Sequence, residues 1–215
     1  MSARAAILGR LARAAGQPAE ARRVAVEARL AGHPAGPVPQ QARAEGPARL
    51  AQFIARAEAA AATVSRVSEI AALPAALARE LRARNLPAAV RLGSEPLFEG
   101  LDWGTLEASR GVGRIDEPAT LSRAAFGLAE TGTLALLSGP DNPVTLTFLG
   151  ETHFAVLRAA DVCGGFEDFW ERWRAAGHDS RTINLVTGPS RSADIGQVLQ
   201  LGAHGPVALH VFVVG

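Results

Sequence analysis

The segment Ala124-Ala125-Phe126-Gly127-Leu128-Ala129-Glu130-Thr131-Gly132-Thr133-Leu134-Ala135-Leu136-Leu137 places a short polar turn between two apolar runs. The runs predict two short strands, and Glu130-Thr131-Gly132-Thr133 predicts the turn that joins them, with Gly132 supplying a positive φ. Glu130 is the main candidate for chemistry, because a carboxylate flanked by apolar strands can act as a base or as a covalent nucleophile. The alternative is a turn glutamate that accepts backbone hydrogen bonds, beside threonines that satisfy local backbone groups.

Strand and helix patterns alternate on both sides of this segment. Short apolar runs predict strands, and apolar residues at helical spacing predict helices. Ser68 predicts the N-cap of one helix, and Asn85 predicts its end. The alternation predicts an α/β fold, a parallel sheet with helices outside. The further expected strands are 63–67, 88–92, 144–148, 154–157, 183–187 and 209–214, and the expected helices are 40–62, 68–85 and 166–176.

The N-terminal residues differ in character from the rest of the chain. Residues 1–32 predict one or two amphipathic helices separated at Pro18, and the segment 33–39, with three prolines and a glycine, predicts a linker. We therefore divide the chain into an N-terminal helical arm with a Pro-rich linker, residues 1–40, and an α/β domain, residues 41–215. The arm is interpreted either as a contact for a partner or as a helical cap on its own domain.

Length and charge narrow the class of function. A chain of 215 residues with 48% hydrophobic content is long enough for one substantial domain. The net charge is +1, from 22 basic and 21 acidic residues, which gives no field that favours nucleic acid or an anionic membrane. Every basic residue is arginine, so Schiff-base chemistry and a P-loop lysine are excluded.

Cysteine usage and the N-terminus indicate the compartment. Cys163 is the only cysteine, so it cannot form a disulfide within the chain or supply the thiolates of an iron–sulfur cluster. Arg4, Arg10 and Arg13 interrupt the apolar run that a secretory signal needs. No segment reaches the roughly 18 to 20 apolar residues of a membrane helix. We expect a cytoplasmic protein without membrane insertion.

The segment Gly188-Pro189-Ser190-Arg191-Ser192-Ala193-Asp194-Ile195 is the second candidate for binding. It follows an expected strand and predicts the start of a helix that runs to Leu201. Ser190, Arg191 and Ser192 at a helix N-terminus would hold a carboxylate or phosphate. The alternative is that Ser190 or Ser192 is only an N-cap and that Asp194 complements the helix dipole.

The segment Leu201-Gly202-Ala203-His204-Gly205-Pro206 follows, with Gly202 expected to terminate that helix. His204 is a candidate acid/base group or anion donor, and His153, just before an expected strand, is considered in the same way. A loop histidine without chemistry is the alternative for both. The spacing of the histidines and carboxylates matches no metal site, so none is predicted.

Three segments in this order, residues 127–134, 188–195 and 201–206, resemble the lactate-utilisation (LUD) family, specifically its small LutC-type member, over about residues 45–215. The resemblance implies a fold like that of the NagB/RpiA/CoA-transferase superfamily, a Rossmann-like α/β sheet with flanking helices and a ligand cleft. It also implies a role in oxidising L-lactate to pyruvate beside partner subunits that carry iron–sulfur clusters. No cofactor is expected in this chain itself.

Three hypotheses follow. In the first, the chain is a non-cluster subunit whose cleft binds a small carboxylate or other anion, or holds the partner. In the second, it is an acyl- or CoA-transferase-like enzyme with Glu130 as nucleophile; a sugar-phosphate isomerase-like activity is a third reading. The candidate catalytic residues are Glu130 and His204, and the candidate ligand-binding residues are Thr131, Gly132, Thr133, Gly188, Ser190, Arg191, Ser192, Asp194 and Gly205.

Overall fold

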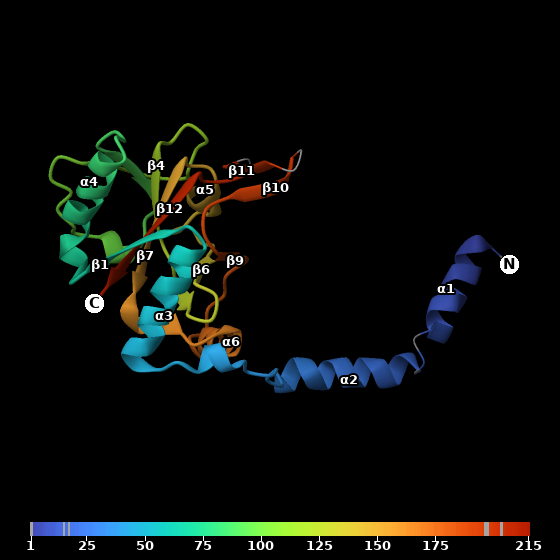
Figure 1. Ribbon diagram of the computed structural model, residues 1–215. Coiled ribbons are helices and arrows are strands. Elements are labelled where there is room, and N and C mark those ends of the chain that lie inside the picture. Colours follow the sequence, from blue (N-terminus) through green and yellow to red (C-terminus); the bar gives the residue numbers. More distant parts are fainter. Residues whose placement is uncertain (1, 15, 17, 196–197, 203) are drawn as a thin grey trace. The chain divides into compact units, whose positions relative to one another are not determined.

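The computed structural model describes residues 2–14, 16, 18–195, 198–202 and 204–215, and the chain divides into two units, Met1–Pro37 and Val38–Gly215 (Figure 1). The first unit contains helices α1 (Ala3–Ala14) and α2 (Ala19–Gly32). Pro18 stands at the N-cap position of α2, and His33, with φ of 40°, ends it. The second unit contains all the strands and is described by itself below.

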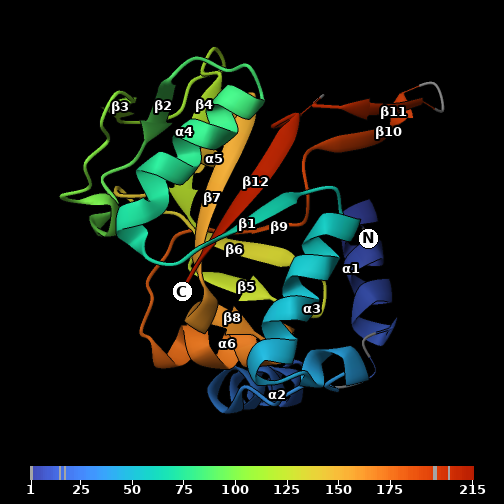
Figure 2. The ribbon, with the colours of Figure 1, turned by 60° about the vertical axis from the view of Figure 1, so that its left-hand side comes forward.

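A six-stranded parallel sheet forms the centre of the second unit, in the order β1-β12-β7-β4-β2-β3. Figure 2 shows these strands side by side, with α4 lying across them. The central strands β7 and β12 are buried along most of their length, as expected where helices cover both faces of a parallel sheet. The strands are β1 (Thr63–Val67), β2 (Ala89–Leu92), β3 (Glu107–Arg110), β4 (Ala119–Arg123), β7 (Thr152–Arg158) and β12 (Ala208–Val214).

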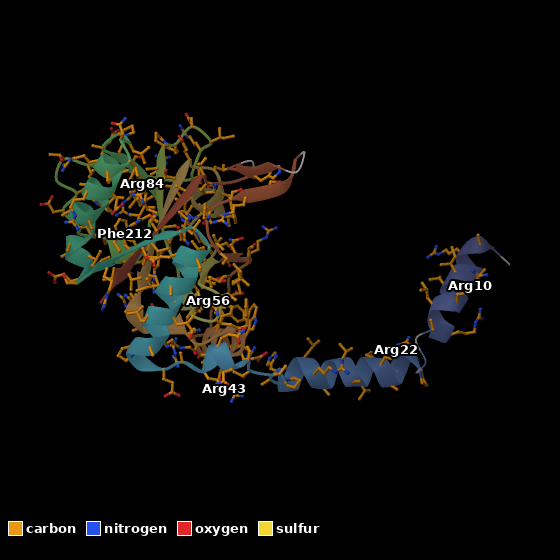
Figure 3. All side chains as sticks on the ribbon, viewed as in Figure 1. Arg10, Arg22, Arg43, Arg56, Arg84 and Phe212 are labelled. Atoms are coloured by element: carbon orange, nitrogen blue, oxygen red, sulfur yellow. The ribbon has the colours of Figure 1, made fainter. Side chains whose placement is uncertain are left out.

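Alternate residues of β7 and β12 pack into different cores. Phe154 and Phe212 pack with α4 (Leu73–Ala83), and Figure 3 labels Phe212 and, close to it, Arg84 at the end of α4. Ala155 and Val211, one residue along each strand, pack instead with α3 (Gly46–Ala59). This alternation follows the two-residue period of a strand and confirms the expected α/β class.

A second, four-stranded sheet has the order β8-β5-β6-β9 and packs on α6 (Phe166–Ala175). Strands β5 (Phe126–Leu128) and β6 (Thr133–Leu137) are antiparallel, with Leu128 opposite Thr133, so the expected strand–turn–strand around Glu130 is confirmed. The outer strands are β8 (Val162–Cys163) and β9 (Ile183–Val186). Short 3₁₀ turns lie at Gln40–Arg43, Ile70–Ala72, Pro96–Phe98 and Ala159–Asp161.

Several predictions of local structure are wrong. Val144–Phe148 is a helix, α5, instead of a strand, although its apolar residues alternate with threonines as in a strand; the adjacent residues Leu146 and Thr147 are both buried, so tertiary packing overrides the local pattern. Strands β3 and β4 were not expected. Ser68 is not an N-cap, since the turn at Ile70–Ala72 begins after Glu69, whereas Asn85 follows the end of α4 with φ of 55°.

The expected helix from residue 190 to 201 is also wrong. β10 (Arg191–Ile195) and β11 (Val198–Leu201) form an antiparallel hairpin, with Arg191 opposite Leu201. Figures 1 and 2 show this hairpin extending away from the parallel sheet. Cross-strand pairing supplies the backbone hydrogen bonds that a helix would have formed.

Candidate functional site

Two cavities lie at opposite edges of the parallel sheet. The first, which we call the amino-edge pocket, has a volume of about 270 Å³ and lies at the starts of β7 and β12. It brings together two of the three sequence segments singled out above, at 188–191 and 204–206, and adds His153. Its lining residues are Thr147, Phe148, His153, Leu185, Val186, Gly188, Pro189, Ser190, Arg191, His204, Gly205, Pro206 and Leu209.

His153 is the most deeply buried polar group of this pocket. Its Nε2 lies 2.6 Å from the hydroxyl oxygen of Ser122 on the neighbouring strand β4, and both side chains are buried. Burial lowers the pKa of His153 to about 4, so the imidazole is neutral at pH 7. A neutral imidazole held by a serine offers the pocket a hydrogen-bonding group without a charge.

The loop at 188–191 is held by backbone contacts with the third segment and with the end of α3. The Ser190 N–H donates to the Pro206 carbonyl at 2.9 Å, which joins the second and third segments. Gly188 has φ of 74° and lies so close to the Ala60 carbonyl that a Cβ would not fit. The Arg191 guanidinium donates to the same carbonyl at 2.9 Å through Nη2. The loop is therefore positioned without a helix.

Because the 188–191 loop leads into a strand, a helix dipole cannot be the basis for anion binding at this segment. Ser190, Arg191 and Ser192 do not stand at a helix N-terminus, so the helix-dipole argument for them is wrong. Ser192 lies in β10 opposite Gln200 and does not line the pocket. Asp194 is likewise in β10 and not in the first turn of a helix, and its side chain lies outside what the structure describes. Ala203 lies outside the described residues altogether.

The Glu130 turn lies beside the amino-edge pocket but does not line it. Gly132 has the expected positive φ, 71°, and its N–H donates to the Leu128 carbonyl at 2.9 Å. The Thr133 hydroxyl oxygen lies 2.6 Å from that of Thr131 and 2.6 Å from that of Thr187, which precedes Gly188. A chain of three hydroxyls thus connects the first segment with the second.

Glu130 itself is half-buried and its carboxylate packs against Gly165, where a Cβ would not fit. The Glu130 backbone N–H donates to the Gly164 carbonyl at 2.9 Å, which holds the turn against the segment after β8. Glu130 lines neither of the two cavities described here. The transferase hypothesis, which requires this carboxylate to face a substrate, stays a prediction.

The second cavity, which we call the carboxyl-edge cleft, has a volume of about 920 Å³. It lies where β4 ends at Arg123 and β7 ends at Arg158, the edge at which open α/β sheets bind ligands. None of its residues was a candidate from the sequence. They are Glu95, Pro96, Leu97, Arg123, Ala125, Phe126, Leu137, Ser138, Gly139, Asp141, Asn142, Arg158, Asp161, Arg172, Ala176, His178 and Ser180.

A partly buried ion pair forms one wall of this cleft. The Arg123 Nη1 donates to Glu95 Oε1 at 3.1 Å, and Arg123 Nη2 lies 3.9 Å from Asp161 Oδ2. Asn142 Nδ2 donates to the carbonyls of Arg123 and Leu137, at 3.2 and 3.1 Å. Among the described residues, Arg123 Nε and Asn142 Oδ1 are buried without a hydrogen-bond partner. The wall is therefore polar and incompletely satisfied.

In the described part of the chain, no cluster of three or more histidine, cysteine, aspartate or glutamate side chains is placed to hold a metal ion. Of the helices described, none is both long and apolar enough to cross a membrane.

Comparisons with known proteins give the family and the fold. The LUD domain family matches residues 50–214. Lactate utilization protein C of Anoxybacillus flavithermus is 37% identical over 50% of this chain and 50% of the relative, and that of a Geobacillus species is 33% identical over 54% and 52%. The chain thus spans about half the length of these curated relatives.

A solved structure shares the fold. The crystal structure of a DUF162 family protein from Deinococcus radiodurans matches with a TM-score of 0.58 and 25% identity, over 78% of this chain and 96% of that one. The resemblance inferred from the three segments is confirmed by the family match, which covers all three. The chain belongs to the LUD domain family.

Proposed function

We propose that this chain acts in lactate utilisation as a subunit without an iron–sulfur cluster of its own, and that it binds a small carboxylate in the amino-edge pocket. The observation that carries the proposal is the convergence of the 188–191 loop, the 204–206 connection and buried His153 on one small cavity. The names of the relatives, lactate utilization protein C, indicate the pathway.

The composition of the pocket suits a three-carbon hydroxy or keto acid. Arg191 uses one of its five N–H donors on the Ala60 carbonyl, and the others are available to a carboxylate. Ser190 and His204 add hydrogen-bonding groups, and neutral His153 faces the substituent on the second carbon without adding charge. Phe148, Leu185 and Val186 would contact the methyl group.

The redox step is assigned to partner subunits. Oxidation of lactate releases two electrons, which need an acceptor, and a cluster commonly requires four thiolates. This chain has a single cysteine, Cys163, which is buried. In this proposal the chain binds the carboxylate, and iron–sulfur subunits accept the electrons.

Ligand binding is tested by thermal denaturation of the whole chain with and without L-lactate or pyruvate. A ligand that binds only the native state raises the midpoint. We expect Arg191→Ala to abolish the rise. Arg66→Ala is the matched control, because Arg66 is also exposed and also donates to a backbone carbonyl, that of Gly215. No rise in the parent protein, or an equal rise in the Arg191 variant, would refute carboxylate binding at this pocket.

The assignment to lactate utilisation is tested separately. Deleting the gene should impair growth on L-lactate but not on glucose, and the tagged chain should co-purify with proteins that carry iron–sulfur clusters. Normal growth on lactate after deletion would count against the role, even if the pocket binds lactate.

A further inference from the structure

The carboxyl-edge cleft has three side chains that are free to meet a ligand. Among the described residues, exposed Arg158 makes no side-chain hydrogen bond or ion pair, and neither does exposed Asp141. The exposed ring of His178 makes a T-shaped contact with the ring of Phe126, with the ring centroids 5.9 Å apart. These groups come from the end of β7, the loop after β6 and the loop after α6, and all line the same cleft.

The other two guanidinium groups of the cleft are already engaged. Arg123 is held by Glu95 and Asp161, and Arg172 donates to the Ala160 carbonyl at 3.1 Å and to Cys163 Sγ at 3.3 Å. Arg158 is therefore the anchor that remains for an anionic group within the described cleft. One free guanidinium matches one phosphoryl or carboxylate group, in a bidentate contact.

The carboxylates of the cleft disfavour a ligand that carries several anionic groups and nothing else. Asp141 would repel a second anionic group but accepts hydrogen bonds from hydroxyl groups, as acidic residues do with ribose in dinucleotide sites. His178 presents an aromatic face on which a flat ring can stack. The volume of about 920 Å³ is more than three times the 270 Å³ of the amino-edge pocket and suits a ligand well above the size of lactate.

We infer that the carboxyl-edge cleft is a second ligand site that takes a nucleoside monophosphate. Its phosphate is bound by Arg158, its ribose hydroxyls by Asp141, and its base stacks on His178. This site is separate from the carboxylate pocket and does not depend on the role proposed for that pocket.

The experiment measures binding of AMP to the full chain by isothermal titration calorimetry. We expect Arg158→Ala to weaken AMP binding about tenfold or more, the effect of losing a charge-assisted contact, and to leave adenosine binding unchanged. Arg79→Ala is the matched control: Arg79 is exposed on α4 and, among the described residues, makes no side-chain hydrogen bond or ion pair. The Arg79→Ala variant should bind AMP with the same affinity as the parent protein.

Truncated probes test the other two contacts. His178→Ala should weaken AMP and adenosine alike and should not affect ribose 5-phosphate, which lacks the base. Asp141→Asn should weaken AMP more than 2′,3′-dideoxy AMP, which lacks the two ribose hydroxyls. The inference is overturned if AMP does not bind the parent protein, or if AMP binds the Arg158 and Arg79 variants equally well. Ribose 5-phosphate binding as tightly as AMP would refute the stacking of a base.

Discussion

Acidification from pH 7 to pH 5 should destabilise the folded chain through two buried histidines. His210 on β12 is buried; its Nδ1 lies 2.7 Å from Thr63 Oγ1 and 3.2 Å from an Arg84 nitrogen, and its Nε2 lies 2.9 Å from Ser65 Oγ. Nδ1 therefore accepts the Arg84 N–H, and a proton on Nδ1 would face another donor. Burial lowers the pKa of His210 to about 4, with Glu80 opposing and Arg84 assisting the shift.

The sign and size of the effect follow from proton linkage. The folded pKa values of His153 and His210 are about 4, below the 6.5 of an unperturbed histidine, so the unfolded chain binds more protons between these values. Stability is therefore highest above pH 6.5 and is lost as the pH falls toward 4. Between pH 7 and pH 5 the loss is about 2 kcal/mol per histidine, or about 4 kcal/mol in all.

The assay is urea unfolding followed by tryptophan fluorescence at pH 7, 6 and 5. His153→Gln and His210→Gln keep a hydrogen-bonding side chain but do not titrate, so each should remove about half of the pH-dependent loss. Each variant is compared with its own stability at pH 7, because the substitution itself changes packing. A parent protein equally stable at pH 5 and pH 7, or variants with the parent's pH slope, would refute the reasoning.

Three further predictions concern the Glu130 turn and the cysteine. In a urea titration, Gly132→Ala should lower the free energy of unfolding by more than 2 kcal/mol, because a Cβ there meets the backbone of α3. Gly100→Ala is the control: Gly100 also has a positive φ, 70°, but open space surrounds it, so this substitution should cost only about 1 kcal/mol. Thr133→Val should cost about 1 to 2 kcal/mol, because it leaves two neighbouring hydroxyls unpaired, and no loss would show that the hydroxyl chain is not structural. Burial raises the pKa of the Cys163 thiol, so a thiol reagent at pH 7 should label it much more slowly in the native chain than in urea, and equal rates would contradict its burial.

The parts of the fold that the sequence predicts are those in which local pattern and burial agree. The run ending at Leu128 and the run starting at Thr133 are strands because both sit in apolar cores and Gly132 can adopt the positive φ of the turn. The 191–201 segment was not predictable in this way. Its short apolar stretches suit a helix or a hairpin equally, and pairing between β10 and β11 decides between them.

The two cavities differ in how far the sequence predicts them. The 188–191 and 204–206 segments were recognisable because each is a compact run of glycine, proline and polar residues, and the Ser190 to Pro206 hydrogen bond joins them. The residues of the carboxyl-edge cleft are ordinary one by one. Arg123 and Arg158 line the same cleft because β4 and β7 are parallel neighbours, and β4 was not expected at all. Recognising Arg123 as the last residue of a strand was the signal that would have found the cleft.

The position of the two cavities on one strand limits what they can do together. His153 stands at the second position of β7 and Arg158 at its last, five residues further on, which is a separation of about 16 Å along an extended strand. A small acid bound beside His153 therefore cannot touch a phosphate bound to Arg158, and no group can pass directly between them. The strand between them is buried and packed on both faces. Substitutions at the two cavities should therefore act independently. In urea titrations, the changes in free energy of unfolding caused by His153→Gln and by Arg158→Ala should add in the double variant to within about 0.5 kcal/mol.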